Sequence, residues 1–282
     1  MSSWRGSVHF KIKCSERFYD IGVAEANMIG ISAGLALCGK NVYCYSIIPF
    51  LVMRAFEQIR VDIAYHNLNV KLIGVGGGFT YGLEGFTHFG LEDLALMRSL
   101  PNMTVVVPAD PIEAKCLAEL SYEYKGPMYI RLGRTGEPVI HDNNPALKIG
   151  KAIILKEGGN VAIFAIGNMV YIGKQVVDML VTKGVDATLI NMHTLKPLDV
   201  ENVIQIASSH EALFSLEEHN IDGGLGTAIA EVLAEINYNG KFKRFGINGL
   251  NNVIGKADYL REQHGLTVER IYSEILNKVN EA

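Results

Sequence analysis

Short apolar runs alternate with longer stretches of helical periodicity along nearly the whole chain. The apolar runs predict β-strands, and apolar residues spaced three or four apart predict helices. Their alternation predicts parallel sheets whose strands are connected by crossover helices. The predicted strands lie at residues 18–21, 42–47, 70–75, 103–107 and 128–132, then at 150–155, 161–166, 186–191 and 211–216. The predicted helices lie at 24–38, 51–66, 90–99 and 111–124, then at 168–183, 199–208, 224–236 and 266–280.

The alternation lapses over residues 134–147, which contain two prolines and a cluster of polar residues. Such a stretch is typical of a linker. Several strand-like runs, such as Val105 to Val107, are apolar throughout, as expected for strands covered on both faces. We therefore expect an α/β protein with two doubly wound α/β/α domains and mostly parallel sheets, the first domain over residues 1–140 and the second over 148–282.

The composition argues against several classes of protein. The 282 residues carry a formal net charge of −4 without any basic run, which argues against nucleic acid or an anionic membrane as a partner. No apolar stretch approaches the ~20 residues of a membrane helix, and the N-terminus lacks the apolar core of a signal peptide. The four cysteines show no CxxC spacing and read as reduced thiols, so we expect a cytoplasmic protein.

Glu25 lies at a predicted strand–turn–helix corner. The apolar run from Phe18 to Ile21 is followed by Gly22 and then by a helix whose apolar residues share one face. Glu25 falls in the first turn of that helix, where open α/β sheets place their ligand sites. An acid in a first turn also complements the helix dipole, so Glu25 alone does not separate a functional role from a structural one.

Three further features follow predicted strands, so a parallel sheet would gather them with Glu25 at one edge. Phe50 follows one strand and either forms a flat wall for a planar ring or belongs to the core, and Arg54 lies in the helix after it. Arg131 and Arg134, at the end of another strand, either suit an anionic substrate or are surface arginines near the linker.

The remaining feature is a glycine-rich stretch, residues 74–88, with six glycines within twelve residues. Glycines permit backbone conformations and close approaches that side chains forbid. The spacing is neither GxGxxG nor that of a P-loop, so we interpret the stretch as a substrate-lining loop rather than a nucleotide loop. His88 closes it, with Glu84 four residues earlier, and this pairing favours a functional histidine over a structural one.

These features lie in segments that resemble the pyrimidine-binding domain of transketolase and of 1-deoxyxylulose-5-phosphate synthase. The resembling segments are residues 18–27, 54–60, 85–98 and 106–110. Residues 150–282 resemble the C-terminal domain of the same family, through the motifs at 194–199 and 216–226. The resemblance covers the chain from Arg17 onward. It implies a transferase that moves a two-carbon ketol unit from a ketose, or a ketose phosphate, to an aldose with thiamine diphosphate.

The resemblance assigns cofactor contacts to three residues. Glu25 matches the glutamate that hydrogen-bonds the aminopyrimidine ring of thiamine diphosphate, which makes it a catalytic residue. Phe50 matches the aromatic residue that stacks on that ring, and Arg54 is assigned to the same cofactor-binding group.

The resemblance assigns substrate contacts to four residues. His88 matches the histidine that contacts the oxygen atoms of the donor sugar and is the second expected catalytic residue. Glu84 stands where transketolase carries an aspartate that reads a substrate hydroxyl. Arg134, or alternatively Arg131, matches the arginine that holds the substrate phosphate.

Departures from the family pattern imply a partner. The Gly-Asp-Gly motif of the diphosphate- and Mg²⁺-binding domain does not occur, so we expect a partner chain that supplies this domain and holds Mg²⁺, in a dimer or a two-plus-two heterotetramer. The first domain is also expected to be N-terminally shortened, because family members carry additional residues before the segment that matches Arg17. Gly76, Gly77 and Gly78 occupy the region of a phosphate-binding histidine, which permits a modified or differently sized sugar.

Two alternative functions stay open. The β subunits of 2-oxo-acid dehydrogenases share the two-domain plan and the glutamate, although residues 85–93 look more like transketolase. A non-catalytic regulatory subunit would fit a shortened N-terminus, but the retention of Glu25, Glu84 and His88 argues against it.

The second half offers no comparable cluster. Glu217, Glu218 and His219 could suggest metal or acid–base chemistry, but we interpret them as a strand end at a subunit interface. No metal site is expected within this chain.

Overall fold

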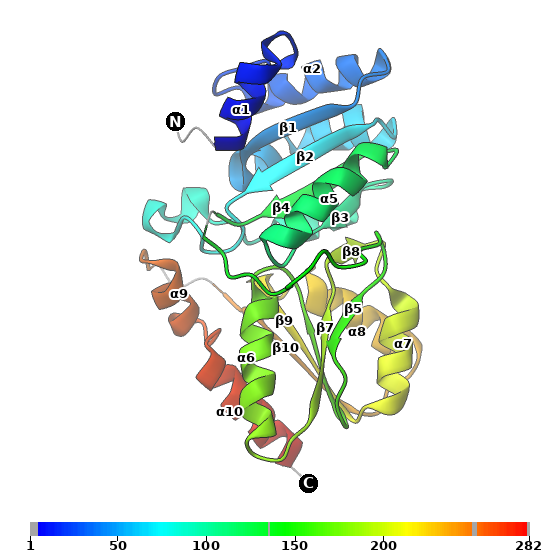
Figure 1. The fold of residues 1–282 in the computed structure, drawn as a ribbon, viewed down its shortest axis with the longest axis vertical. Coiled ribbons are helices and arrows are strands. Elements are labelled where there is room, and N and C mark those ends of the chain that lie inside the picture. Colours follow the sequence, from blue (N-terminus) through cyan, green and yellow to red (C-terminus); the bar gives the residue numbers. More distant parts are fainter. Residues whose placement is uncertain (1–4, 135, 250–252, 281–282) are drawn as a thin grey trace.

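The computed structural model describes residues 5–134, 136–249 and 253–280, which form two five-stranded sheets placed one above the other (Figure 1). The strand orders are β1-β2-β4-β3-β8 in the first sheet and β10-β9-β6-β7-β5 in the second. In each sheet four strands are parallel and one edge strand, β8 or β5, is antiparallel. The predicted α/β architecture with two mostly parallel sheets is confirmed.

The strands of the first sheet are β1 (Val42–Ile47), β2 (Val70–Val75), β3 (Thr104–Val106), β4 (Met128–Leu132) and β8 (Thr194–Lys196). Side chains along β1 alternate between its faces. Cys44 Sγ lies 2.9 Å from Ser32 Oγ in α2 (Glu25–Leu37), and Tyr43 Oη lies 2.9 Å from Ser121 Oγ in α5 (Pro111–Glu123). The helices α2 and α5 therefore cover opposite faces of the sheet.

The predicted strand at residues 18–21 is wrong. This segment follows α1 (Arg5–Lys13) and a short 3₁₀ turn as irregular chain, and Tyr19 is 63% exposed. The Asp20 carboxylate accepts a hydrogen bond from the Gly22 amide (3.1 Å), and Gly22 adopts a φ of +73°. A strand needs a partner for its backbone groups, but β1 is the edge strand on this side of the sheet and pairs only with β2 among the described residues.

The single α-helix predicted at residues 51–66 is also wrong in detail. The chain forms π-helical turns at Pro49–Met53 and Ile59–Tyr65, with only the short α3 (Phe56–Gln58) between them. The Arg54 amide, for example, bonds to the Pro49 carbonyl five residues earlier (3.4 Å). Such wide turns are rare and occur frequently at functional sites.

The second sheet contains β5 (Ile153–Lys156), β6 (Val161–Ala165), β7 (Ala187–Asn191), β9 (Ala212–Asn220) and β10 (Lys241–Ile247). Its helices are α6 (Met169–Val181), α7 (Val200–Ser209), α8 (Leu225–Glu235), α9 (Ala257–Gln263) and α10 (Val268–Asn280). Along β6, Ile163 packs in the core formed with α6 and α10, whereas Phe164 packs in the core formed with α7 and α8. Helices therefore cover both faces of this sheet as well.

The two halves of the chain are joined through the first sheet. Strand β8 comes from the second half but pairs with β3, and the Val107 amide donates to the His193 carbonyl (2.8 Å) beside this pairing. The helix α4 (Asp93–Ser99) shares a hydrophobic core with α8 of the second domain. Among the described residues, no helix is both long and apolar enough to cross a membrane.

Candidate active site

Glu25 is brought to the end of β1 by the direction of α2. This helix precedes β1 through a short turn, so its first residue lies beside the carboxyl end of the strand. Ser46, near the end of β1, donates a hydrogen bond from Oγ to Glu25 Oε1 (3.2 Å). The Glu25 side chain is only 10% exposed, while its second oxygen, Oε2, makes no hydrogen bond to another described residue. One carboxyl oxygen is therefore fixed by a hydrogen bond, and the other is available to a ligand.

Phe50, Arg54 and His88 gather beside this open oxygen. Arg54 Nη1 lies 3.9 Å from Glu25 Oε2, and the Arg54 guanidinium lies over the Phe50 ring, 4.2 Å from its centroid. The edge of the His88 ring meets Phe50 at a centroid distance of 5.0 Å and an interplanar angle of 75°. Thr87 Oγ1 lies 2.9 Å from His88 Nδ1, so this contact orients the imidazole.

Two tyrosines lie beside this cluster, and one of them, Tyr81, connects it to Arg134. The Tyr81 ring lies 6.3 Å from the His88 ring, and the Arg134 guanidinium lies 5.9 Å from the Tyr81 centroid. Burial, with a smaller contribution from the nearby Tyr81, raises the pKa of Tyr45 to about 12. Both tyrosines lie in stretches with features of a functional site, but nothing in their spacing distinguishes them from core aromatics.

Glu84 and Arg131 lie apart from the cluster. The Glu84 side chain is exposed and makes no hydrogen bond or ion pair with another described residue. Arg131 is 4% exposed and donates from Nε to Asp93 Oδ2 (3.0 Å) and from Nη2 to the Gly90 carbonyl (2.6 Å). Its donors are directed into the protein, so of the two arginines considered for the substrate only Arg134 is exposed.

The residues around Glu25 have the chemistry that an aminopyrimidine ring requires. Glu25 Oε2 can exchange a proton with a ring nitrogen, and the half-buried Phe50 offers an aromatic face for a planar ring. The nearby Arg54 supplies a cation whose side chain is 56% exposed. No group of three or more potential metal ligands occurs among the described side chains.

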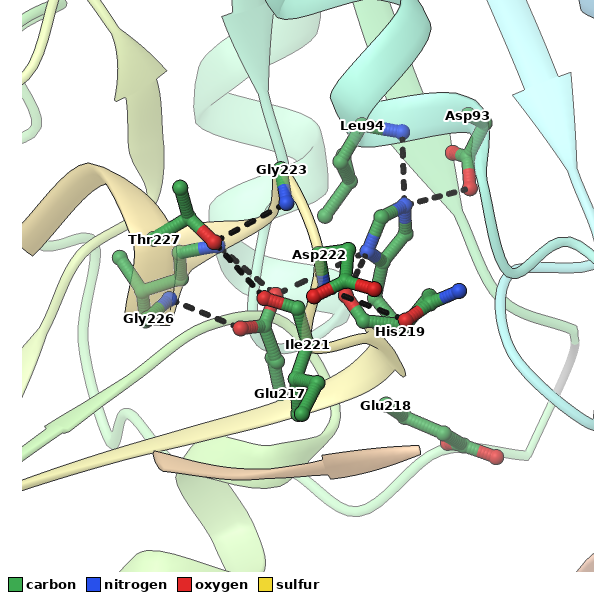
Figure 2. A network of polar contacts seen from close by, with 12 residues as sticks. Asp93, Leu94, Glu217, Glu218, His219, Ile221, Asp222, Gly223, Gly226 and Thr227 are labelled. Atoms are coloured by element: carbon green, nitrogen blue, oxygen red, sulfur yellow. Dashed lines mark hydrogen bonds and ion pairs between the residues drawn. The ribbon is translucent and has the colours of Figure 1, made fainter. Parts of the chain in front are cut away.

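The Glu217–Glu218–His219 triplet lies in β9 and is fully buried inside one chain, so the predicted position at a subunit interface is wrong. Successive strand residues face opposite sides. Figure 2 accordingly shows Glu217 and His219 reaching into one network while Glu218 points away from it. Glu217 accepts hydrogen bonds from the Leu225 and Gly226 amides (2.7 and 2.8 Å), which caps the start of α8. Burial raises the pKa of Glu217 to about 7.

His219 joins the second domain to α4 of the first (Figure 2). Its Nε2 accepts a hydrogen bond from the Leu94 amide (3.2 Å), and its Nδ1 donates to the Asn220 carbonyl (2.7 Å). This pattern is that of a neutral ring. Burial lowers the pKa of His219 to about 4, although the nearby Asp93 opposes the change. The triplet is therefore structural.

A separate cleft of about 540 Å³ lies between the domains, lined by α4, the β8 segment and the start of α8. Its cations are already paired within the chain. Arg98 forms a two-pronged ion pair with Glu231, and Lys196 donates to the carbonyls of Arg98 and Leu100. None of the predicted site residues lines this cleft, so we do not assign the chemistry to it.

Comparisons with known proteins point to one family for both halves of the chain. The family model of the transketolase pyrimidine-binding domain matches residues 1–137, and that of the transketolase C-terminal domain matches residues 150–271.

Two relatives and one solved structure resemble most of the chain. A 6-deoxy-6-sulfo-D-fructose transketolase subunit of Clostridium sp. is 40% identical, over 90% of this chain and 79% of that protein. One subunit of the apulose-4-phosphate transketolase of Actinobacillus succinogenes is 36% identical, over 91% of this chain and 83% of that protein. A solved split gene transketolase, described as an inactive beta4 tetramer, superposes with a TM-score of 0.89 at 36% identity, over 99% of this chain and 89% of that chain.

Proposed function

This chain belongs to the transketolase family, and from that premise we propose that it is the C-terminal subunit of a split transketolase. In this reading it transfers a two-carbon ketol unit from a ketose to an aldose together with a partner chain. The convergence of Glu25, Phe50 and His88 at one edge of the first sheet is the observation that carries the proposal. The fold alone does not require an acid, an aromatic face and an imidazole at this position, so their presence together indicates a functional site.

We assign the cofactor contacts to Glu25, Phe50 and Arg54. Thiamine diphosphate, when bound, supplies the electron sink that ketol transfer requires. Glu25 would hold a proton against the ring nitrogen through Oε2, while Ser46 fixes Oε1. Phe50 would support the ring face, and Arg54 would limit the entry of water from the exposed side.

We assign the substrate contacts to His88, Arg134 and Glu84. His88 would donate to oxygen atoms of the donor sugar, because its Nδ1 side is taken by Thr87. Arg134 would bind an anionic group at the far end of the sugar. The names of the two relatives specify a phosphorylated and a sulfonated sugar, which supports an anionic ketose as donor here. Glu84, on the exposed turn between Tyr81 and His88, would read a hydroxyl.

We propose that Mg²⁺ and the diphosphate are held by the partner chain. Two relatives are named as transketolase subunits, and the similar solved structure is named as a split gene transketolase that is inactive as a beta4 tetramer, which supports the need for a second kind of chain. A two-plus-two heterotetramer would place the Glu25 edge against a diphosphate-binding domain. No observation favours a 2-oxo-acid dehydrogenase or a purely regulatory subunit.

A reconstitution assay tests the proposal. The chain is mixed with a partner chain carrying the diphosphate-binding domain, thiamine diphosphate, Mg²⁺, a phosphorylated or sulfonated ketose and an acceptor aldose. We expect a ketose product two carbons longer than the acceptor, and only when both chains are present. Formation of this product by the partner chain alone would contradict the proposal.

A further inference from the structure

The loop that carries Tyr81 and His88 belongs to the first domain in sequence but packs into the second. We call residues 78–90 the substrate loop. Its two ends pair with each other, because the Gly78 amide donates to the Gly90 carbonyl (2.8 Å) and the Gly90 amide donates to the Gly78 carbonyl (3.1 Å). Phe79 and Phe89, just inside these ends, are 0% and 3% exposed and share a hydrophobic core with α6 and α10. The base of the loop is therefore part of the second domain's core.

Glu218 holds the first end of the substrate loop. The Phe79 amide donates a hydrogen bond to Glu218 Oε1 (2.9 Å). Gly78, with a φ of +64°, lies so close that a Cβ there would be 2.4 Å from Glu218 Cδ. Only glycine leaves room for this carboxylate to approach the backbone.

Arg131 holds the other end. Its Nη2 donates both to the Gly90 carbonyl (2.6 Å) and to the Glu218 carbonyl (3.0 Å), while Asp93 neutralises the guanidinium. The loop ends are thus bonded to one strand of each domain, β4 through Arg131 and β9 through Glu218.

Arg261, in α9, is hydrogen-bonded to the buried Glu218 carboxylate and is its ion-pair partner. Its Nη2 donates to Glu218 Oε2 (3.0 Å), and Asn168 donates to the same oxygen. Glu218 is fully buried, whereas Arg261 is 23% exposed. A buried carboxylate that loses its counter-charge must be neutralised or move toward water. The orientation of Glu218, and with it the Phe79 hydrogen bond, therefore depends on Arg261.

Residues around α9 also cover the side of the substrate loop. The His264 ring stacks on Phe79 at a centroid distance of 5.3 Å and an interplanar angle of 24°. A Cβ at Gly82 would lie 2.3 Å from the Gly255 carbonyl oxygen, so the two backbones touch. Figure 1 shows α9 beside this part of the first domain.

From these contacts we infer that the second domain positions the substrate loop, and that Arg261 is a positioning residue for substrate use, acting through Glu218. Arg261 itself touches neither Tyr81 nor His88 among the contacts of the described residues. The second domain thereby positions part of the site, although it contributes no group to the cluster around Glu25. The catalytic consequence of this positioning rests on the proposed ketol transfer, whereas the structural consequence does not.

Hydrogen exchange on the full chain tests the structural part. In Arg261→Met we expect the amides of Phe79 and Gly90 to exchange about tenfold faster or more, because the loop base opens more often. Arg261→Lys, which keeps the charge, should restore most of the protection. Asp258→Asn is the matched control, since Asp258 is the other ion-pair partner of Arg261 and is almost fully exposed. Unchanged exchange in Arg261→Met, or an equal change in Asp258→Asn, would overturn the inference.

Steady-state kinetics of the two-chain assembly test the catalytic part. Arg261→Met should raise KM for the donor ketose about tenfold or more while kcat changes less, and Arg261→Lys should return KM toward the wild-type value. An unaltered KM in Arg261→Met would refute the role in substrate use. If the wild-type assembly transfers no ketol unit, the proposed function fails, while the exchange result still decides whether the second domain holds the loop.

Discussion

At Glu25 the two carboxyl oxygens have different surroundings, and this difference gives the residue its capacity for chemistry. Oε1 is fixed by Ser46, whereas Oε2 faces Arg54 at 3.9 Å and is free to bond a ligand. A carboxylate with both oxygens paired would be a structural anchor. One with a single open, nearly buried oxygen is placed to hold a proton for a bound ring.

The substitution Glu25→Gln tests whether Oε2 has to hold a proton, because it replaces one carboxyl oxygen by an amide nitrogen. The amide keeps the shape and the contact with Ser46 but cannot hold or release the proton, so we expect ketol transfer by the two-chain assembly to fall about a hundredfold or more. Glu57→Gln, a change at an exposed residue of α3, is the control and should leave the rate unchanged. A Glu25→Gln assembly that kept at least half the wild-type rate would rule out the role.

Arg134 is expected to act on binding and to depend on substrate charge. Loss of a charge-assisted contact costs about 1.5–3 kcal/mol, so Arg134→Met should raise KM for a phosphorylated ketose by roughly 10- to 100-fold. A neutral ketose should show little change. Arg60→Met serves as the control, because Arg60 contacts only Tyr65 among the described side chains. Equal KM changes for charged and neutral donors would contradict a phosphate-binding role.

At the scale of elements, the sequence predicted what depends on local pattern. The long helices and buried strands were predicted because their periodicity is strong, and a parallel sheet then placed Glu25, Phe50 and His88 at one edge. The three-residue β8 was missed because its pairing with β3 is set by tertiary contact alone. The segment 18–21 has the composition of a strand but no partner in the sheet.

The same reasoning explains why Arg131 could not be separated from Arg134 by sequence. Arg131 lies in the strand at residues 128–132 and Arg134 follows it closely, and only the structure shows that Arg131 is directed toward Asp93 on α4. The position of Tyr81 could not be predicted from the sequence for a related reason. Its position between His88 and Arg134 results from the fold of the substrate loop, which is fixed by residues more than a hundred positions away.

The Asp110 side chain connects helix α5 to the linker at residues 134–147. Its Oδ1 accepts from the Glu113 amide (2.8 Å) and caps α5, and its Oδ2 accepts from the amides of Ile140 and His141 (2.8 and 2.9 Å). Loss of an N-cap costs about 1 kcal/mol, and stranded amides add to this, so Asp110→Ala should lower the free energy of unfolding by about 2–3 kcal/mol. Urea unfolding measures the change. The exposed helical Asp178→Ala is the control, and equal losses would refute the double role.

At the scale of the whole molecule, the carboxyl ends of the strands have different roles in the two sheets. The carboxyl ends of β1, β2 and β4 carry the Glu25 cluster or lead into its loops. The carboxyl ends of β6, β7 and β9 are instead covered by the first domain, as the contacts of His193 and His219 with Val107 and Leu94 show. An α/β domain normally keeps this edge for a ligand. Here the second domain uses it to hold the first.

The contact between the two domains at His193 should make the free energy of unfolding depend on pH in the acid range. The side chain is 1% exposed, and its Nε2 has no partner among the described residues. Burial, together with the nearby His141, lowers its pKa to about 4, while the Lys151 backbone and Asp199 oppose the change. An unfolded histidine titrates near 6.5. Between pH 4 and 6.5 the unfolded chain therefore binds the additional proton, so acid favours unfolding.

His193→Gln isolates this contribution from the other buried groups that titrate. The free energy of unfolding of the wild type minus that of the variant should be constant above about pH 6.5 and should fall by about 1.4 kcal/mol for each pH unit from there toward pH 4. Chemical unfolding at a series of pH values measures the difference. Substitution of the exposed His66 by Gln provides the control. A pH-independent difference for His193→Gln would mean that the imidazole has the same pKa in the folded and unfolded states, which would contradict the prediction.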